Sequence, residues 1–288
     1  MANLEKIVAD KSVADAQWKQ QRQAERENIT AIQDAGLEEI TTDPEAYARY
    51  LNMQGDNPAY SAGNIALVMV QGEGFTTFGT RERWKTLGRT VLDTEQKKGV
   101  TIFAKSPLSR GYTLAEAYDV KQTQGREMKQ IRLYDNSQEM ETALTAVLNY
   151  SVVPVVVDKE LSVPAYYDPE QMELSVNPDF SDSEALSAIT TEIAHARFHG
   201  KGANPSYNRA DYELDAQSVS YILCRRFGIS QDVPDLARLP ELYRGWDIQD
   251  RRKALDSIQN MSKQFGGSIE RNIAPQQRSR PPMRRAAR

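Results

Sequence analysis

The sequence is poor in the residues that build disulfides and metal sites. Its 288 residues include one cysteine, Cys224, and two histidines, His195 and His199. A single cysteine excludes an intramolecular disulfide and any zinc site built from several cysteines. No apolar run approaches the roughly 18 residues that cross a membrane, and the N-terminal residues carry charges without an apolar signal core. These absences lead us to expect a cytoplasmic protein with no membrane partner.

Charge is abundant and segregated along the chain. Residues 81–132 contain twelve Lys/Arg against six Asp/Glu, and residues 271–288 contain six arginines and no acid, although the net charge is −4. A basic segment and a basic tail are typical of proteins that bind a polyanion such as nucleic acid, although a solvated charged surface has the same composition.

Hydrophobic periodicity predicts an α+β protein of two domains. Helix patterns and caps fall near residues 4–34, 44–52, 61–71, 138–149, 184–198, 209–227 and 250–265, and strand patterns fall near 75–120, 152–157, 165–167 and 172–176. We expect a helical extension, a first α+β domain, a second α+β domain and a disordered Arg-rich tail, over residues 1–40, 41–135, 136–265 and 266–288.

One short motif points to metal chemistry. Thr191 to His195 reads Thr-Glu-Ile-Ala-His, one residue away from H-E-x-x-H, in which two histidines bind zinc and the glutamate activates a water. Thr191 stands at the first ligand position and is a poor zinc ligand. Glu192 is then a vestigial general base and His195 the remaining ligand. A match of this length also arises by chance around a buried histidine.

Other residues could complete a remodelled metal site. His195 and His199 are four residues apart and share a helix face. Glu213 or Asp215 of the next helix could supply a third ligand, whereas the neutral amide of Gln217 is a weak one. In that site Ala196 would stand where the general base belongs. We therefore expect no bound cofactor, and zinc only if the site is remodelled in this way.

Cations and aromatic residues interleave in the basic segment. Binding of single strands without sequence preference needs cations for phosphates and aromatic faces for bases. The candidates are Tyr60, Arg81, Arg83, Trp84, Lys85, Arg89, Lys97 and Lys98. Basic residues alternate around Trp84, so a base could stack on its ring while phosphates meet the cations. The alternative is that Trp84 and Tyr60 are core residues and only the cations are exposed.

Several of these pieces occur together in a known pattern. They are Tyr60-Ser61 with Asn64 and Gln71, Trp84-Lys85-x-x-Gly88-Arg89, Tyr118-Asp119-Val120, Thr191 to His195, and Asp215-Ala216-Gln217-Ser218. In their order and spacing, the region from about Tyr47 to Ile229 resembles the ArdC-type antirestriction family, which includes LtrC-like proteins of conjugative elements. The resemblance implies a domain that binds single-stranded DNA joined to a zincin-like metallopeptidase domain, and it adds Asn64 to the DNA candidates.

Two departures from the family pattern fall in one site. The resemblance aligns Thr191 with the first zinc histidine and Gln217 with an acidic third ligand, so both donors are lost. The resemblance thus implies an antirestriction-type protein of a mobile element that binds single-stranded DNA. Its metallopeptidase-like domain is then inactive and acts as a scaffold or as a partner-binding module. Two alternatives remain open: an active zinc metallopeptidase with a remodelled site, and an adaptor that binds proteins through its N-terminal helix and Arg-rich tail.

Overall fold

The chain divides into two compact units. The computed structural model describes residues 3–106, 110–200 and 202–279. Unit 1 comprises residues 1–39 and 63–126, and unit 2 comprises residues 40–62 and 127–288. The helix α2 (Pro44–Asp56) therefore belongs to unit 2, which differs from the expected first domain of residues 41–135. None of the helices in the described residues has the length and apolar character needed to cross a bilayer.

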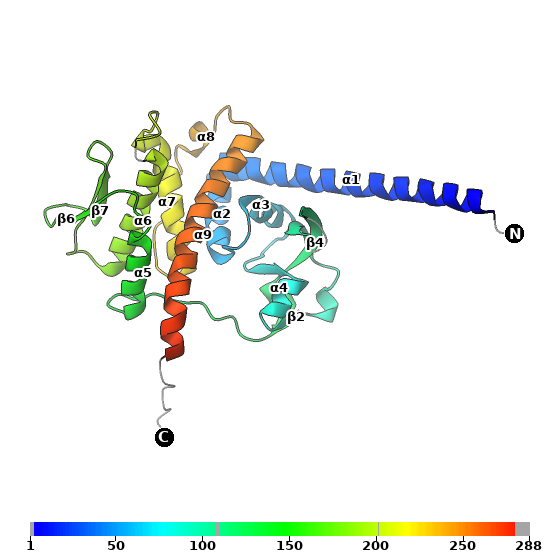
Figure 1. Cartoon of the computed structure of the whole chain (residues 1–288), viewed down its shortest axis with the longest axis horizontal. Helices are drawn as coiled ribbons and strands as arrows, with labels where there is room; N and C mark the ends of the chain where they lie inside the picture. The colour runs from blue at the N-terminus through cyan, green and yellow to red at the C-terminus, as the bar shows by residue number, and fades with distance from the viewer. Residues whose placement is uncertain (1–2, 107–109, 201, 280–288) are drawn as a thin grey trace, which may run out of the picture. The chain divides into compact units, whose positions relative to one another are not determined.

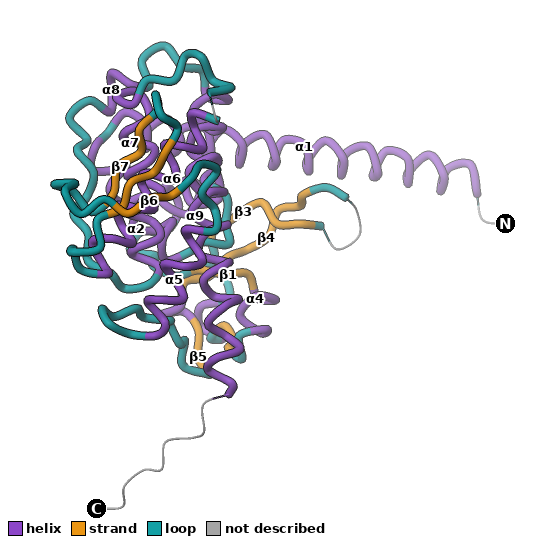
Figure 2. The backbone as a smooth tube through the Cα atoms, turned by 60° about the vertical axis from the view of Figure 1, so that its left-hand side comes forward, coloured by secondary structure: helices purple, strands orange, loops and turns teal. Residues whose placement is uncertain are grey.

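Unit 1 combines helices with a small antiparallel sheet. Its helices are most of α1 (Leu4–Thr42), α3 (Ala62–Gln71) and α4 (Arg81–Thr86). The sheet has the order β1 (Phe78–Thr80), β4 (Tyr112–Asp119) and β3 (Val100–Lys105), and a separate ladder pairs β2 (Arg89–Val91) with β5 (Thr123–Gly125). Two 3₁₀ turns, η1 (Asp93–Glu95) and η2 (Val120–Gln122), precede β3 and β5. Figure 2 shows the β3–β4 hairpin as the longest paired part of this unit.

The free edge of β3 is covered by side chains of α3. Asn64 donates to the carbonyl oxygen of Phe103 at 2.8 Å and accepts from its backbone nitrogen at 3.0 Å. Gln71 makes the same pair of bonds with Thr101, at 2.9 and 3.1 Å. Each amide side chain thus replaces one residue of a missing neighbouring strand, which satisfies backbone groups that an edge strand would otherwise expose.

Helix α1 is longer than the sequence pattern predicts. The pattern predicts a helix near residues 4–34 that ends before Gly36, but the helix continues to Thr42. A Cβ at Gly36 would lie 2.9 Å from Val70 Cγ2 and 3.0 Å from the carbonyl oxygen of Ala66. Gly36 is therefore a packing residue that lets α1 approach α3 closely, and it does not cap the helix.

Unit 2 is built on helices with one small mixed sheet (Figure 1). Its further helices are α5 (Gln138–Leu148), α6 (Asp182–His199), α7 (Arg209–Arg226), α8 (Leu239–Leu242) and α9 (Ile248–Ser279). The sheet has the order β6 (Val155–Val157), β8 (Glu173–Val176) and β7 (Ala165–Asp168), with β6 parallel and β7 antiparallel to β8. Helix α7 packs against α2, α6 and α9, and β7 lies along α6. The α+β class expected from the sequence is confirmed in both units.

The last helix extends further than the sequence pattern predicts, which places its end near residue 265. Helix α9 runs to Ser279, and Phe265, Ile269 and Ile273 are fully buried at helical spacing. Gly266 lies inside this helix and makes room for the guanidinium of Arg226, since a Cβ there would clash with it. The rest of the basic tail, residues 280–288, lies outside the described residues.

Candidate functional site

The Thr191–His195 segment lies in the second half of α6, on a helix with well-defined ends. Ser181 caps the N-terminus, because its hydroxyl accepts from the backbone of Glu184 while the Glu184 carboxylate accepts from the backbone of Ser181. Gly200 ends the helix in the left-handed conformation, with φ of 61°. Thr191, Glu192 and His195 are 9%, 5% and 0% exposed, so the motif faces the interior of unit 2.

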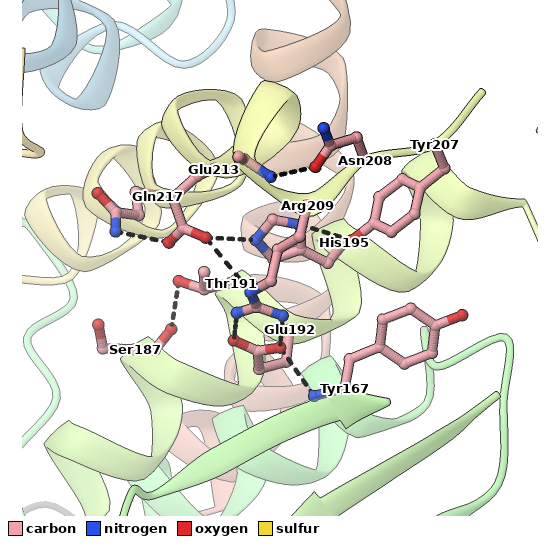
Figure 3. A network of polar contacts seen from close by, with 11 residues as sticks. Tyr167, Ser187, Thr191, Glu192, His195, Tyr207, Asn208, Arg209, Glu213 and Gln217 are labelled. Carbon is pink, nitrogen blue, oxygen red and sulfur yellow. Dashed lines mark hydrogen bonds and ion pairs between the residues drawn. The ribbon is translucent and has the colours of Figure 1, made fainter. Parts of the chain in front are cut away.

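Glu192 has donors on both of its carboxylate oxygens (Figure 3). Arg209, the first residue of α7, donates to Oε1 at 2.5 Å and to Oε2 at 2.9 Å. The backbone nitrogen of Tyr167 on β7 donates to Oε2 at 2.8 Å. A bidentate guanidinium and a backbone donor therefore satisfy both oxygens of this carboxylate. In this arrangement Glu192 anchors α7 and β7 to α6 and does not face water as a base.

Arg209 also reaches a second carboxylate. Its Nε lies 3.4 Å from Glu213 Oε2, so the guanidinium lies between Glu192 and Glu213 (Figure 3). Partial burial opposes the charge of Arg209, but the two carboxylates outweigh that cost and raise its pKa. The pKa of Glu213 is lowered, first by its contact with His195 and further by Arg209 and Gln217. The centre of the site is therefore an ion-pair network around one guanidinium.

His195 is fully buried between two partners. Its Nδ1 and the hydroxyl of Tyr207 lie 3.0 Å apart. Its Nε2 lies 3.3 Å from Glu213 Oε2, an ion-pair distance that lacks the geometry of a hydrogen bond. His195 and Glu213 are thus brought together as the remodelled site would require, but Arg209 Nε lies 3.4 Å from the same Glu213 oxygen, Oε2.

The other candidate ligands point elsewhere. His199 Nδ1 lies 2.7 Å from the Tyr167 hydroxyl, and its ring stacks on Tyr207 at 4.7 Å. Stacking continues from Tyr207 to Tyr212 and from Tyr212 to Phe198, at 5.6 and 5.1 Å.

Asp215 lies two residues from Glu213 along α7, so it projects from a different face of that helix and lines a separate cavity.

The residues present do not fit a catalytic metal ion. The Thr191 hydroxyl donates to the carbonyl oxygen of Ser187 at 3.1 Å, and the Gln217 amide donates to Glu213 Oε1 at 2.7 Å. Within residues 3–106, 110–200 and 202–279, no three His, Cys, Asp or Glu side chains are grouped to hold a metal. Arg209 already supplies positive charge between the two carboxylates, as a metal ion would.

Sequence reasoning missed Arg209 and Tyr207. The spacing of four between Arg209 and Glu213 is a signal for an ion pair on one helix face. No local pattern, however, reveals that Arg209 also meets Glu192, seventeen residues earlier in the chain. That contact depends on how α6 and α7 pack.

Trp84 does not offer a face for base stacking. It is 1% exposed, and its Nε1 donates to the carbonyl oxygen of Tyr118 at 2.9 Å. Asn64 is 6% exposed and is held by the edge of β3. Tyr60 is half-buried and belongs to unit 2, whereas the basic segment belongs largely to unit 1. The core alternative stated for Trp84 therefore holds, because its indole fills the space between α4 and β4.

The candidate cations fall into two groups. Arg81 and Arg89 are committed to hydrogen bonds inside unit 1, and Lys98 pairs with Glu95 at 2.9 Å. Among the candidate cations, Arg83, Lys85 and Lys97 are exposed and make no ion pair with the described residues. Of the candidate cations, only Arg83, Lys85 and Lys97 can therefore pair with a phosphate without first breaking an ion pair or a hydrogen bond of unit 1.

Unit 1 also has a groove that the sequence did not reveal. A cavity of about 340 Å³ lies between α1 and the start of β4, and it is lined by Trp18, Lys19, Arg22, Arg26 and Tyr112 among others. Trp18 is 59% exposed and Tyr112 is 56% exposed. Arg22 lies 5.3 Å over the Trp18 ring, and Arg26 donates to the carbonyl oxygen of Tyr112 at 2.9 Å. We call this surface the α1 groove.

Comparisons with known proteins agree on the fold. No protein-family model matches the chain. An uncharacterized protein of Bacillus anthracis is 25% identical over 109 residues, which are 38% of this chain and only 18% of that relative's length. Two crystal structures of the antirestriction protein ArdC from plasmid R388 superpose with TM-scores of 0.51 (metal-free) and 0.50 (Mn(II)-bound), at 15% and 17% identity; both matches cover 85% of this chain and 98% of ArdC. This chain therefore has the fold of the antirestriction protein ArdC.

Proposed function

We propose that this chain is an ArdC-like antirestriction protein of a plasmid or other mobile element. In this proposal it acts in the cytoplasm, binds single-stranded DNA through unit 1, and uses unit 2 as a metallopeptidase-like scaffold without hydrolytic activity. The likeness to ArdC over 85% of the chain supports the antirestriction role. The α1 groove supports the DNA partner, and the ion-pair network around Arg209 supports the loss of hydrolysis.

The α1 groove is the observation that carries DNA binding. Two exposed aromatic rings and three cations share one depression with a single carboxylate, Glu25, which lies 4.0 Å from Arg22. The excess of positive charge beside aromatic rings matches the needs of a single strand, whose bases stack while its phosphates meet positive charge. The free cations Arg83, Lys85 and Lys97 extend positive charge over the same unit. Trp18 and Tyr112 thus take the role that the sequence had suggested for Trp84.

The variants Trp18→Ala and Tyr112→Ala should each weaken binding of a labelled single-stranded oligonucleotide by roughly 1–3 kcal/mol. Arg22→Ala should flatten the dependence of log affinity on log salt by about 0.7 to 1 unit, because one phosphate contact is lost. Fluorescence anisotropy at several salt concentrations measures both effects. Tyr134→Ala is the matched control, since Tyr134 is an exposed aromatic residue of unit 2, and it should bind like the parent.

The possible outcomes separate the site from the function. If the parent prefers single strands but the Trp18 and Tyr112 variants bind equally well, the groove is not the site and the exposed cations on α4 take its place. If the parent shows no preference for single over double strands, DNA binding fails and the protein-adaptor alternative replaces it.

An active metallopeptidase with a remodelled site is the second candidate. The 3.3 Å approach of His195 Nε2 to Glu213 Oε2 favours it, as does the Mn(II)-bound state of ArdC. Its test is hydrolysis of a generic peptide library with Zn²⁺ or Mn²⁺ present. Metal-dependent turnover that disappears in His195→Ala while the fold persists would establish this candidate and displace the scaffold.

A further inference from the structure

A second cavity of unit 2 lies apart from the Thr191–His195 site. It has a volume of about 480 Å³, within the range of small-molecule sites, and α7, the end of α6 and the start of α9 border it. Its lining includes Phe198, Tyr212, Asp215, Trp246, Asp250 and Lys253. We call it the Asp215 pocket.

Asp215 is a carboxylate without a compensating donor. Protein atoms surround it except where it opens on the pocket, and burial, with no hydrogen bond to offset it, raises its pKa to about 7. The tyrosine hydroxyls behind it belong to Tyr47, Tyr50 and Tyr243, whose own pKa values are raised by burial and by this carboxylate. Tyr47 bonds to Ser218 at 2.9 Å and Tyr50 to the carbonyl oxygen of Leu255 at 3.4 Å.

The one cation in the pocket lining is already paired. Lys253 Nζ lies 2.8 Å from an Asp250 oxygen at the mouth of the cavity. Among the described residues that line the pocket, no other positive side chain faces Asp215. A half-buried carboxylate that lacks both a cation and hydrogen-bond donors is costly to the fold, and such groups are found where a ligand completes them.

Aromatic rings form the walls of the pocket. Tyr212 and Phe198 stack at 5.1 Å with an interplanar angle of 25°, and Tyr207 also stacks on Tyr212, at 5.6 Å. Trp246 packs edge-on against Tyr243 at 5.3 Å and is still 45% exposed. Fixed aromatic faces around a carboxylate attract an organic cation through the ring quadrupoles as well as by charge.

We propose that the Asp215 pocket binds a small organic cation, an amine or amidine group on a flat apolar body. The cationic group pairs with Asp215, and the flat body lies against the exposed ring of Trp246. A neutral ligand of the same shape leaves the carboxylate unpaired, and an anion is repelled by Asp215 and Asp250. This site is independent of the proposed DNA binding and of the Thr191–His195 site.

Calorimetric titration of the full chain with benzamidine tests the proposal, with benzamide and benzoate as neutral and anionic probes of similar shape. At about pH 8 we expect saturable one-to-one binding of benzamidine and at least about tenfold weaker binding of the other two, a difference of about 1.4 kcal/mol. Asp215→Asn should lose the preference for benzamidine, and Trp246→Ala should weaken binding but keep that preference. Asp211→Asn removes one exposed charge from the same helix and should bind like the parent.

A pH series adds a readout that a merely structural role of Asp215 would not move. Benzamidine binding should weaken from about pH 8 to about pH 5, because Asp215 takes up a proton while the probe stays charged. Asp250 and Lys253 also face the pocket, so Asp250→Asn is the second control and should keep this pH dependence. Benzamide binding as tightly as benzamidine, no saturable binding of benzamidine, or an unchanged affinity in folded Asp215→Asn would each overturn the proposal.

Discussion

Replacing Arg209 by alanine should lower the free energy of unfolding by about 3–5 kcal/mol, one of the two largest effects expected in this protein. The reason is that Glu192 is 5% exposed and would be left as a buried carboxylate with only the backbone nitrogen of Tyr167 as donor. Glu213 would lose part of its compensation as well. Chemical denaturation at neutral pH measures the change.

The matched control is Arg244→Ala, because Arg244 is an exposed arginine of the same unit and should cost less than about 1 kcal/mol. A double variant, Arg209→Met with Glu192→Gln, should recover part of the loss, since neither charge is then buried alone. Equal stability of Arg209→Ala and the parent would show that the ion pair is not what holds α6 and α7 together.

Asparagine at Asp215 should stabilise the protein at about pH 8 by roughly 2–4 kcal/mol and change little at about pH 4. The Asp215 carboxyl has a pKa of about 7 in the folded chain, against an ordinary value of 3.8. Between pH 3.8 and about pH 7, the Asp215 carboxyl binds its proton more tightly in the folded state than in the unfolded state. Stability is therefore fully present below the ordinary pKa and is lost as the pH rises towards 7. The asparagine side chain does not titrate, so the free energy of unfolding of the variant does not fall in this pH range.

Denaturation curves of the parent and of Asp215→Asn across this pH range test the prediction, with Asp211→Asn as the control that should leave the pH profile unchanged. If Asp215→Asn destabilises equally at every pH, the carboxylate makes a favourable contact in the folded state. The raised pKa and its cause would then be wrong.

The sequence was sufficient for most of the fold because local signals there agree with packing. The helix patterns near residues 184–198 and 209–227 predicted α6 and α7, which the structure contains. The errors arose where a glycine serves packing and not a helix end. Gly36 and Gly266 both lie inside helices, each against a side chain from another element.

The site was predictable only in part, because its chemistry depends on tertiary contacts. The motif located Glu192 and His195, and the family resemblance marked Thr191 and Gln217 as lost ligands. Nothing in the pattern indicated that a guanidinium from the start of α7 would lie between Glu192 and Glu213. The DNA candidates failed in a similar way, since spacing cannot tell a buried indole such as Trp84 from an exposed one such as Trp18.

The metal content of the untagged protein tests most directly whether Arg209 replaces a metal ion in unit 2. The chain should be produced with zinc and manganese in the medium and without a histidine tag, which would add foreign ligands. A variant with Thr191→His, Gln217→Glu and Arg209→Ala serves as the control that regains ligands and loses the guanidinium. Elemental analysis should find no stoichiometric metal in the parent, and chelators should not shift its thermal unfolding. About one zinc or manganese ion per chain, lost in His195→Ala, would contradict the account.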